Sequence, residues 1–357
     1  MASTHVIPEM ELQHTLTESR LRDRFGRAIT DLRVSVTERC NYRCVYCRTG
    51  ESLTPHAELS LAEYVRMIRL LVSLGVEKVR LTGGEPLLRK DLPELIQSIR
   101  ELRCAYDQAD QPTHDGPPLD IALTTNGHLL ASMAAALKQA GLDRITVSMD
   151  AVDPDTFTRI TRVPRAFQQV LDGIHAAQDV GLAPVKVNCV LLRGVNDDQI
   201  EAFGEFARRE QVILRFIEFM PLEEDRIWSP DTVVTEREIL ERLGKVLPLR
   251  PLPANSASET ARRYGFMDGI GEIGIIAPVS RPFCGHCSRI RLTSDGKLRT
   301  CLFSQVDHNL YSRMYQNGTD AALKAYIRTV VSAKEERHHI GEVGFVKPTR
   351  SMVQIGG

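Results

Sequence analysis

The chain has 357 residues, a formal net charge of −1, 43% hydrophobic residues and 25% charged residues, as expected for a globular protein with one large domain and a smaller appendage. A charge so close to zero excludes a general attraction to nucleic acid or to an anionic membrane. No apolar run approaches the ~20 residues needed to cross a bilayer. The N-terminus lacks the basic start and apolar run of a secretory signal. We therefore expect a cytoplasmic protein without nucleic-acid or membrane partners.

Short apolar segments alternate with helical patterns through the first two thirds of the chain. Most of these segments are rich in Val, Ile and Leu, as buried parallel strands are. The expected strands are residues 32–36, 78–81, 120–123, 144–149, 185–191 and 214–219.

Helix start signals lie between the expected strands. Ser60 followed by Glu63 forms a capping box, and Asp153 precedes a proline at the first helical position. Asp91 and Asn196 are expected to begin two further helices. Strand–helix repetition of this kind produces a parallel sheet.

Six strand–helix units are fewer than the eight of a closed barrel. We therefore predict an α/β fold, a partial (β/α)6 barrel of the TIM type, followed by a smaller C-terminal domain. The expected boundaries are 1–20 for a flexible N-terminal tail, 21–230 for the barrel and 231–357 for the C-terminal domain. The polar, proline-containing run 106–118 is expected to be a surface loop insertion.

Six of the eight cysteines fall into two groups of three, which in a reducing compartment indicates metal or cluster ligation rather than disulfides. The first triplet is Cys40, Cys44 and Cys47, spaced C-x3-C-x2-C directly after the first expected strand. Three thiolates on one loop can hold three irons of a [4Fe–4S] cluster and leave the fourth iron open. A zinc loop is the alternative, but structural zinc sites take four ligands.

The first triplet resembles the radical S-adenosylmethionine (SAM) superfamily, whose cluster motif has this spacing and position. Thr82-Gly83-Gly84-Glu85-Pro86, after the second expected strand, is similar to the superfamily's motif for the SAM amino group. The resemblance implies a [4Fe–4S] cluster on Cys40, Cys44 and Cys47. It also implies SAM contacts from Tyr46, Gly84, Ser148 and Met220.

The second triplet is Cys284, Cys287 and Cys301. It can hold another cluster with an open iron, or it can bind zinc with a histidine as the fourth ligand; the candidates are His286, His308, His338 and His339. Arg289 and Arg291 lie between these cysteines, and on a strand their guanidinium groups share one face, as phosphate binding requires. A solvated strand would carry the same Arg-x-Arg pattern.

Several segments together resemble the GTP 3′,8-cyclase family of molybdopterin synthesis. They are the first cysteine loop with the strand before it, Arg80 to Pro86, Thr124 to Gly127, Lys186 to Asn188, Phe283 to Phe303, and the final Gly356-Gly357. The resemblance implies two [4Fe–4S] clusters and SAM as cofactors. It implies a 5′-deoxyadenosyl radical that converts GTP to (8S)-3′,8-cyclo-7,8-dihydroguanosine 5′-triphosphate.

The same resemblance assigns the remaining site residues. GTP contacts are expected from Arg33, Arg80, Thr124, Lys186, Arg289, Ile290 and Arg291, and the open iron of the second cluster is expected to bind guanine. No side chain is assigned as the catalytic group, and Arg215 is kept as a candidate. Gly356 and Gly357 are expected to reach the active site.

A cyclic pyranopterin monophosphate synthase is the expected downstream partner, whereas the electron donor and the choice between monomer and homodimer stay open. Another two-cluster radical SAM enzyme, acting on a peptide, and a non-catalytic zinc module are the alternatives.

Overall fold

The computed structural model describes residues 19–47, 58–107, 109–223, 227–316 and 318–356. Most of the expected N-terminal tail therefore lies outside the described residues. Arg20 is already fixed to the fold, because its guanidinium pairs with Glu77 at 2.7 Å and with Asp110 at 2.5 Å.

The predicted strand–helix repeat is confirmed. The strands are β1 (Asp31–Ser35), β2 (Lys78–Thr82), β3 (Asp120–Thr125), β4 (Arg144–Ser148), β5 (Lys186–Leu191) and β6 (Ile213–Glu218). Each is parallel to the next in the sequence. The helices that follow them are α2 (Leu61–Ser73), α3 (Leu92–Arg100), α4 (Leu130–Gln139), α5 (Pro154–Thr161), α6 (Ala166–Asp179) and α7 (Ile200–Arg209), with short 3-10 turns at Pro86–Leu88 and Asp197–Gln199.

Two of the four expected helix starts are capped as predicted. Ser60 and Glu63 form the capping box of α2, and the Asp153 carboxylate accepts from the main-chain N–H of Thr156 at 2.8 Å. Asp91 precedes α3 but makes no cap bond, since its carboxylate pairs with Arg89 at 2.7 Å. Asn196 makes no cap bond either.

The C-terminal part adds α8 (Glu236–Val246), β7 (Leu249–Leu252), β8 (Arg262–Phe266), β9 (Glu272–Ile276), β10 (Arg289–Leu292), β11 (Lys297–Arg299), β12 (His308–Asn309), α9 (Leu310–Gln316), α10 (Asp320–Ser332) and α11 (Met352–Ile355), with 3-10 turns at Pro230–Thr232 and Cys284–His286. Its strands extend the barrel sheet at both edges, in the order β12-β11-β10-β1-β2-β3-β4-β5-β6-β9-β8-β7. Both β10 and β9 run parallel to their barrel neighbours, β1 and β6. The C-terminal part thus helps to enclose the barrel interior; the boundary at residue 230 stays a prediction.

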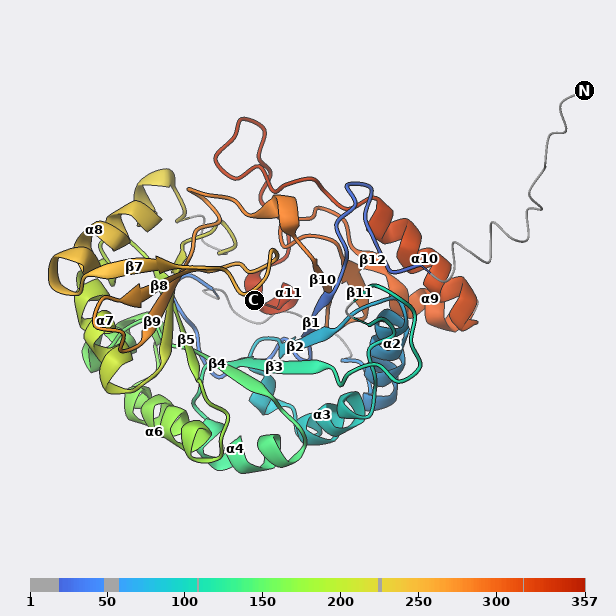
Figure 1. The fold of residues 1–357 in the computed structure, drawn as a ribbon, viewed down its shortest axis with the longest axis horizontal. Helices are drawn as coiled ribbons and strands as arrows, with labels where there is room; N and C mark the ends of the chain where they lie inside the picture. Colours follow the sequence, from blue (N-terminus) through green and yellow to red (C-terminus); the bar gives the residue numbers. More distant parts are fainter. Residues whose placement is uncertain (1–18, 48–57, 108, 224–226, 317, 357) are drawn as a thin grey trace, which may run out of the picture.

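The hydrophobic core lies between the sheet and its helices. Leu32 and Val34 of β1 are buried with the apolar faces of the helices, so the alternate residues Asp31, Arg33 and Ser35 face the interior of the barrel. Figure 1 shows α2, α3, α4, α6 and α7 outside the curved sheet and the C-terminal helix α11 at its centre. The interior therefore receives polar side chains from the strands and the end of the chain.

The 106–118 segment is a surface loop, as predicted. Tyr106 pairs with Pro112 in an isolated bridge, and Arg103 pairs with Pro118 at the base of the loop. Its tip is exposed, while the ring of Tyr106 packs under the guanidinium of Arg20. No helix of the described chain combines the length and the apolar character that a bilayer crossing requires.

Candidate active site

The first cysteine triplet lies on the loop that leaves the C-terminal end of β1. Cys40, Cys44 and Cys47 are half-buried. The loop is fixed to the end of α5, because Arg43 N donates to Thr161 O at 3.2 Å and Val45 N donates to Ile160 O at 3.0 Å. Burial raises the pKa of Cys44, and the nearby Asp150 and the other two thiols raise it further. Mutual repulsion of this kind is relieved when the sulfurs share a cation.

The glycine pair after β2 lies directly against this loop. A Cβ on Gly84 would come within 2.3 Å of Arg39 O, and one on Gly83 within 2.5 Å of Thr37 O. Gly84 N donates to Thr37 O and Glu85 N to Arg39 O, each at 2.7 Å. These positions therefore require glycine for contact with the cysteine loop.

Glu85 joins the loops that follow β2 and β3. Its carboxylate accepts from Thr125 Oγ1 and from Asn126 N, both at 2.7 Å. Asn126 Nδ2 in turn donates to Asn41 Oδ1 at 2.7 Å, within the cysteine loop. Burial raises the pKa of Glu85 to about 7, although these hydrogen bonds lower it. Three strand ends are thereby held in one rigid unit.

The predicted SAM contacts gather at the same end of the barrel. Tyr46 donates its hydroxyl to Asp150 Oδ2 at 2.6 Å, and Ser148 ends β4 two residues earlier. Met220 follows β6 and packs on a small apolar cluster with Leu222 and Ile355. Burial raises the pKa of Asp150 to about 6. Sequence reasoning missed Asp150, which its place just beyond a strand end could have indicated.

A band of cations crosses the barrel interior. The strand register places Arg291 of β10, Arg33 of β1 and Arg80 of β2 side by side, so their side chains share one face. Burial lowers the pKa of Arg33 well below its usual value, and nearby guanidinium groups, Arg291 first, lower it further. Burial also lowers the pKa of Arg80 and of Arg291 to about 10 each.

Thr124, Lys186 and Arg215 continue this band. Arg80 Nη1 donates to Thr124 Oγ1 at 3.1 Å, and Arg215 Nε donates to Asn188 Oδ1 at 2.9 Å. Burial lowers the pKa of Lys186 to about 8 and that of Arg215 to about 9, and neighbouring cations add to both effects. So many cations packed together favour an anionic ligand.

The second cysteine triplet lies at the opposite end of the same strands. Cys284 and Cys287 precede β10, and Cys301 follows the antiparallel strand β11. Burial raises the pKa of Cys284 and Cys301, although the main-chain N–H groups of His338 and Phe303 lower them in part, and the N–H of Arg289 lowers the pKa of Cys287 in the same way. Such N–H···S bonds stabilise thiolates and suit iron–sulfur ligation.

Two cations that sequence reasoning missed support the second triplet. Lys334 is 2% exposed and donates to Arg289 O and Thr300 O, while Arg27 donates to Cys284 O at 2.8 Å. Arg289 Nη2 donates to Cys287 Sγ at 3.3 Å. Burial raises the pKa of Cys287, but Arg289 and Lys334 outweigh burial and bring the pKa to about 7.

The four histidines proposed as zinc ligands differ in their surroundings. His286 is exposed, His339 pairs with Glu342 at 2.9 Å, and His308 pairs with Leu298 between β11 and β12. The His338 ring packs against Phe303, with ring centroids 5.3 Å apart. In the part of the chain that the structure describes, no group of three or more Cys, His, Asp or Glu side chains is arranged to hold a metal ion.

The C-terminal segment enters the barrel from the first-triplet end. A Cβ on Gly356 would lie 2.8 Å from Thr82 Cγ2 and 3.2 Å from Ser35 Cβ, at the ends of β2 and β1. Arg350 anchors the segment through Asp295 at 2.7 Å and Asp307 at 2.5 Å. Gly357 lies outside the described residues. Gly356 thus lies at the C-terminal ends of β1 and β2, and its expected place in the active site stays a prediction.

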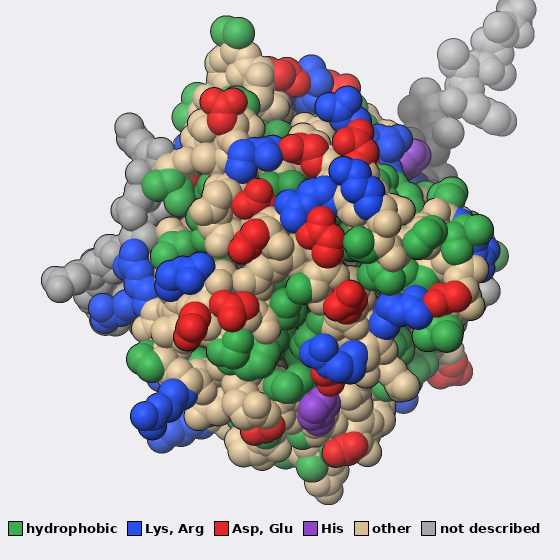
Figure 2. All heavy atoms as spheres, turned by 90° about the vertical axis from the view of Figure 1, so that its left-hand side faces the viewer, with side chains coloured by type: hydrophobic (Ala, Val, Ile, Leu, Met, Phe, Trp, Pro, Cys, Tyr) green, Lys and Arg blue, Asp and Glu red, His purple; other side chains and the backbone are tan. Residues whose placement is uncertain are grey.

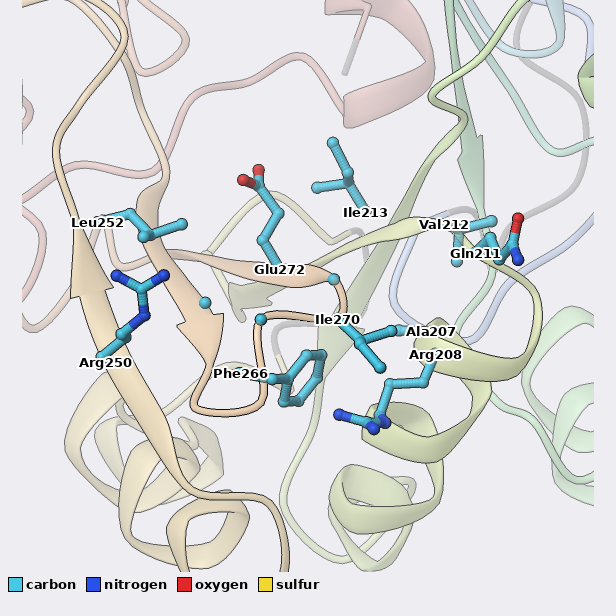
Figure 3. A pocket seen from close by; sticks show the side chains of 13 residues that line it. Ala207, Arg208, Gln211, Val212, Ile213, Arg250, Leu252, Phe266, Ile270 and Glu272 are labelled. Atoms are coloured by element: carbon cyan, nitrogen blue, oxygen red, sulfur yellow. The ribbon is translucent and has the colours of Figure 1, made fainter.

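A separate cavity of about 470 Å³ lies at the outer edge of the sheet, between the end of α7 and the β8–β9 turn (Figure 3). Its lining includes Arg208, Arg250, Phe266, Ile270 and Glu272. Arg208 pairs with Asp268 at 2.5 Å, outside this lining. None of the predicted site residues lines this cavity, so it is distinct from the barrel interior.

The family models divide the chain much as the fold does. Residues 34–207 match the radical SAM superfamily, and residues 212–340 match the Molybdenum Cofactor Synthesis C family. The GTP 3′,8-cyclase of Xanthomonas axonopodis pv. citri is 43% identical to 94% of this chain and 99% of its own length. That of Syntrophomonas wolfei is 40% identical over the same shares. The fold and the site thus define a radical SAM enzyme, whose class uses a [4Fe–4S] cluster and SAM. The chain belongs to the GTP 3′,8-cyclase family.

Solved structures agree on the fold. Streptococcus suis SuiB, solved with its precursor peptide SuiA, superposes with a TM-score of 0.60 over 92% of this chain and 74% of SuiB, at 13% identity. Its SAM-bound structure gives a TM-score of 0.57 at 14% identity, over 92% of this chain and 73% of that one. These values support the shared partial barrel alone. The peptide-modifying alternative is therefore not favoured over the family of the full-length relatives.

Proposed function

We propose that this chain is a GTP 3′,8-cyclase, a lyase that converts GTP to (8S)-3′,8-cyclo-7,8-dihydroguanosine 5′-triphosphate in the first step of molybdopterin synthesis. The observation that carries the proposal is the band of interior cations between two cysteine triplets at opposite ends of the same strands. A triphosphate requires such a band of cations. The band offsets the negative charge of the ligand locally, although the chain as a whole is nearly neutral.

Cys40, Cys44 and Cys47 would hold the first [4Fe–4S] cluster. When bound there, the cluster and SAM together supply a 5′-deoxyadenosyl radical. Tyr46, Gly84, Ser148 and Met220 would surround SAM. The buried hydrogen bond from Tyr46 to Asp150 fixes the ring beside the third cysteine, and the Glu85 network keeps the three loops from moving apart.

Cys284, Cys287 and Cys301 would hold a second [4Fe–4S] cluster that lacks a fourth thiolate and faces the guanine. The three main-chain N–H donors at these sulfurs are fixed by the fold. Burial nevertheless raises the pKa of Cys284 and Cys301, so only Cys287 of the three, with its pKa lowered to about 7 by Arg289 and Lys334 against burial, favours the thiolate before any iron binds.

Arg33, Arg80, Lys186 and Arg291 would bind the triphosphate, with Thr124, Arg289 and Ile290 beside them. Since burial, and then mutual repulsion, lowers the pKa of these cations, a bound anion would offset both effects and hold them fully charged. Arg215 lies across the same interior, fixed by Asn188, and is a candidate for a catalytic role. Gly356 would lie against the bound substrate, where a larger side chain would not fit beside Ser35 and Thr82; by the family resemblance, Gly357 would also contact the substrate.

The product would pass to a cyclic pyranopterin monophosphate synthase, and one electron per turnover must come from a donor. The clustering of six cysteines in two triplets is typical of a reducing compartment, and we place the protein in the cytoplasm.

Anaerobic incubation with SAM, GTP and dithionite tests the proposal. We expect about eight irons per chain after reconstitution, formation of 5′-deoxyadenosine, and the cyclised nucleotide by mass spectrometry. Cys44→Ala should abolish SAM cleavage, and Cys287→Ala should retain SAM cleavage but lose the nucleotide product. Zinc without acid-labile sulfide, or SAM cleavage that GTP never converts into product, would contradict the proposal.

A further inference from the structure

A buried lysine lies beside the second cysteine triplet. Among the residues that the structure describes, Lys334 is the only buried lysine, with 2% of its surface exposed. On the face of the molecule shown in Figure 2, by contrast, Lys and Arg side chains lie at the surface among Asp and Glu side chains. Burying an ammonium group is unfavourable unless hydrogen bonds and nearby negative charge offset the loss of water. The contacts of Lys334 therefore indicate what the buried charge is for.

The Lys334 ammonium bridges the main chain beside two of the three cysteines. Its Nζ donates to Arg289 O at 3.0 Å, two residues after Cys287. It also donates to Thr300 O, which belongs to the peptide unit shared with Cys301. Arg289 begins β10, whereas Thr300 follows β11. One side chain thus holds together the two segments that carry Cys287 and Cys301.

The chain just after Lys334 reaches the third cysteine. Arg27 Nη1 donates to Cys284 O and to Glu336 O, each at 2.8 Å. The guanidinium of Arg27 also pairs with Asp23 at 2.5 Å. All three cysteine-bearing segments are therefore fixed to the chain that follows α10, and of the two cations involved, Arg27 already has a carboxylate partner.

The charge of Lys334 acts on a carboxylate and on two thiols. Burial raises the pKa of Glu335, but hydrogen bonds and the charge of Lys334 lower it overall. Burial raises the pKa of Cys301, and Lys334 opposes this effect more than any other group does. At Cys287, Arg289 and then Lys334 outweigh burial. Lys334 therefore favours negative charge on the sulfurs beside it.

We propose that Lys334 is a positioning residue for the second cysteine triplet: its ammonium holds the segments of Cys287 and Cys301 together and compensates the negative charge of the iron–sulfur cluster that they hold. The proposal deepens the proposed function and rests on it, because that function places a cluster on these cysteines. Reduction adds negative charge to such a cluster, so a fixed cation beside it raises the reduction potential. The midpoint potential therefore measures the charge effect directly.

Lys334→Met removes the charge and the N–H donors but keeps an unbranched side chain of similar length. In the reconstituted enzyme, we expect the midpoint potential of the second cluster to fall by about 59 mV, a tenfold change in the ratio of oxidised to reduced cluster. Potentiometric titration followed by electron paramagnetic resonance measures this shift. The signal that changes on addition of SAM identifies the first cluster, whose midpoint potential should not move. An unchanged second midpoint would overturn the proposal.

Lys334→Arg distinguishes charge from packing. Arginine keeps the charge and the N–H donors but is larger, so a site that needs only packing tolerates Met better than Arg. We expect the opposite order. A chelator should remove iron about tenfold faster from Lys334→Met than from wild type, whereas Lys334→Arg should retain its iron and most of the wild-type midpoint potential. A midpoint as low in Lys334→Arg as in Lys334→Met would overturn the proposal.

Lys138→Met is the matched control. Lys138 Nζ on α4 also donates to a main-chain carbonyl, Gly181 O at 2.9 Å, so its replacement removes the same kind of bond away from the triplet. Both midpoint potentials and the rate of iron release should match wild type. An equal shift in Lys138→Met and Lys334→Met would contradict the proposal, because it would reflect net charge alone.

Glu335→Gln keeps the test possible if Lys334→Met does not fold. Glu335 Oε2 accepts from Thr300 Oγ1 at 2.6 Å, and a glutamine oxygen can accept the same bond. Loss of the negative charge leaves Lys334 less compensated, so the midpoint potential of the second cluster should rise. No shift would show that charge at this segment does not reach the cluster, and the proposal would fail.

These measurements separate the inference from the proposed function. Two clusters in wild type with no effect of Lys334 would overturn the inference and leave the cyclase reading in place. The expected shift, without any cyclised nucleotide from wild type, would overturn the cyclase reading and leave the role of Lys334 standing. Wild type that binds zinc at the second triplet would refute both.

Discussion

Gly84→Ala should separate the two loops that form the SAM end of the barrel. The new Cβ would lie 2.3 Å from Arg39 O, whereas ordinary contact begins near 3.4 Å, so the loops must move apart by about 1 Å. That movement weakens the two 2.7 Å hydrogen bonds, from Gly84 N to Thr37 O and from Glu85 N to Arg39 O. At about 1 kcal/mol each, their loss lowers the free energy of unfolding by about 2 kcal/mol.

The effect on chemistry should exceed the effect on stability. A shift of about 1 Å in the cysteine loop should lower SAM cleavage about 10²-fold, measured as 5′-deoxyadenosine formed with dithionite. Gly244→Ala is the matched control, since Gly244 is exposed in α8 with nothing within 4 Å of a new Cβ; it should gain about 0.5–1 kcal/mol and cleave SAM normally. A Gly84→Ala enzyme with wild-type iron content, Tm and cleavage rate would refute this reasoning.

Three further changes probe other parts of the site. Arg291→Leu removes a guanidinium whose Nε has no hydrogen-bond partner in the described structure. The Kd for GTP should rise about 10- to 100-fold, while SAM cleavage is retained. Equal loss of GTP binding and of SAM cleavage would assign Arg291 to the fold. Burial raises the pKa of Glu85 from 4.5 to about 7, so the folded state holds this proton more tightly than the unfolded state. The free energy of unfolding of the wild type should therefore fall by about 3 kcal/mol as the pH rises from 4.5 to 7. Urea unfolding of Glu85→Gln should lack this part of the pH dependence, and an unchanged slope would contradict the assignment. Arg350→Ala breaks an ion pair with Asp295, whose two side chains are 10% and 12% exposed. Carboxypeptidase should then release the last residues of the chain faster, and GTP turnover should fall. Equal digestion rates in the variant and the wild type would show that other contacts hold the C-terminal segment.

The barrel was predictable because its signals are local. Buried strands such as β5, and the capping boxes and proline starts of the helices, lie within short windows of sequence. The cysteine triplets were predictable from spacing for the same reason. Their proposed roles, and those of the SAM and GTP residues, stay predictions until they are measured.

The extension of the sheet by β10 was not predictable from such windows. Strand β10 pairs with β1 although more than 250 residues separate Asp31 from Arg289, and its sequence Arg-Ile-Arg-Leu carries two charges that a buried strand would ordinarily lack. The arginines tolerate that place because they face the polar interior. The N–H donors at Cys284, Cys287 and Cys301 were also hidden, since any residue can supply a main-chain N–H.

Strand β1 also sets a length. Ser288, one residue after Cys287, meets Asp31 at one end of the strand, and the loop with Cys40 leaves from the other. Five residues at about 3.3 Å each span roughly 17 Å, so the strand fixes the distance between the points where the two cysteine-bearing segments meet it. The loops at either end can vary in length without changing this span. One residue inserted in β1, by contrast, would lengthen the strand and turn Arg33 towards the helices. The length of this one strand therefore limits the size of a molecule that can contact both ends of β1 at once.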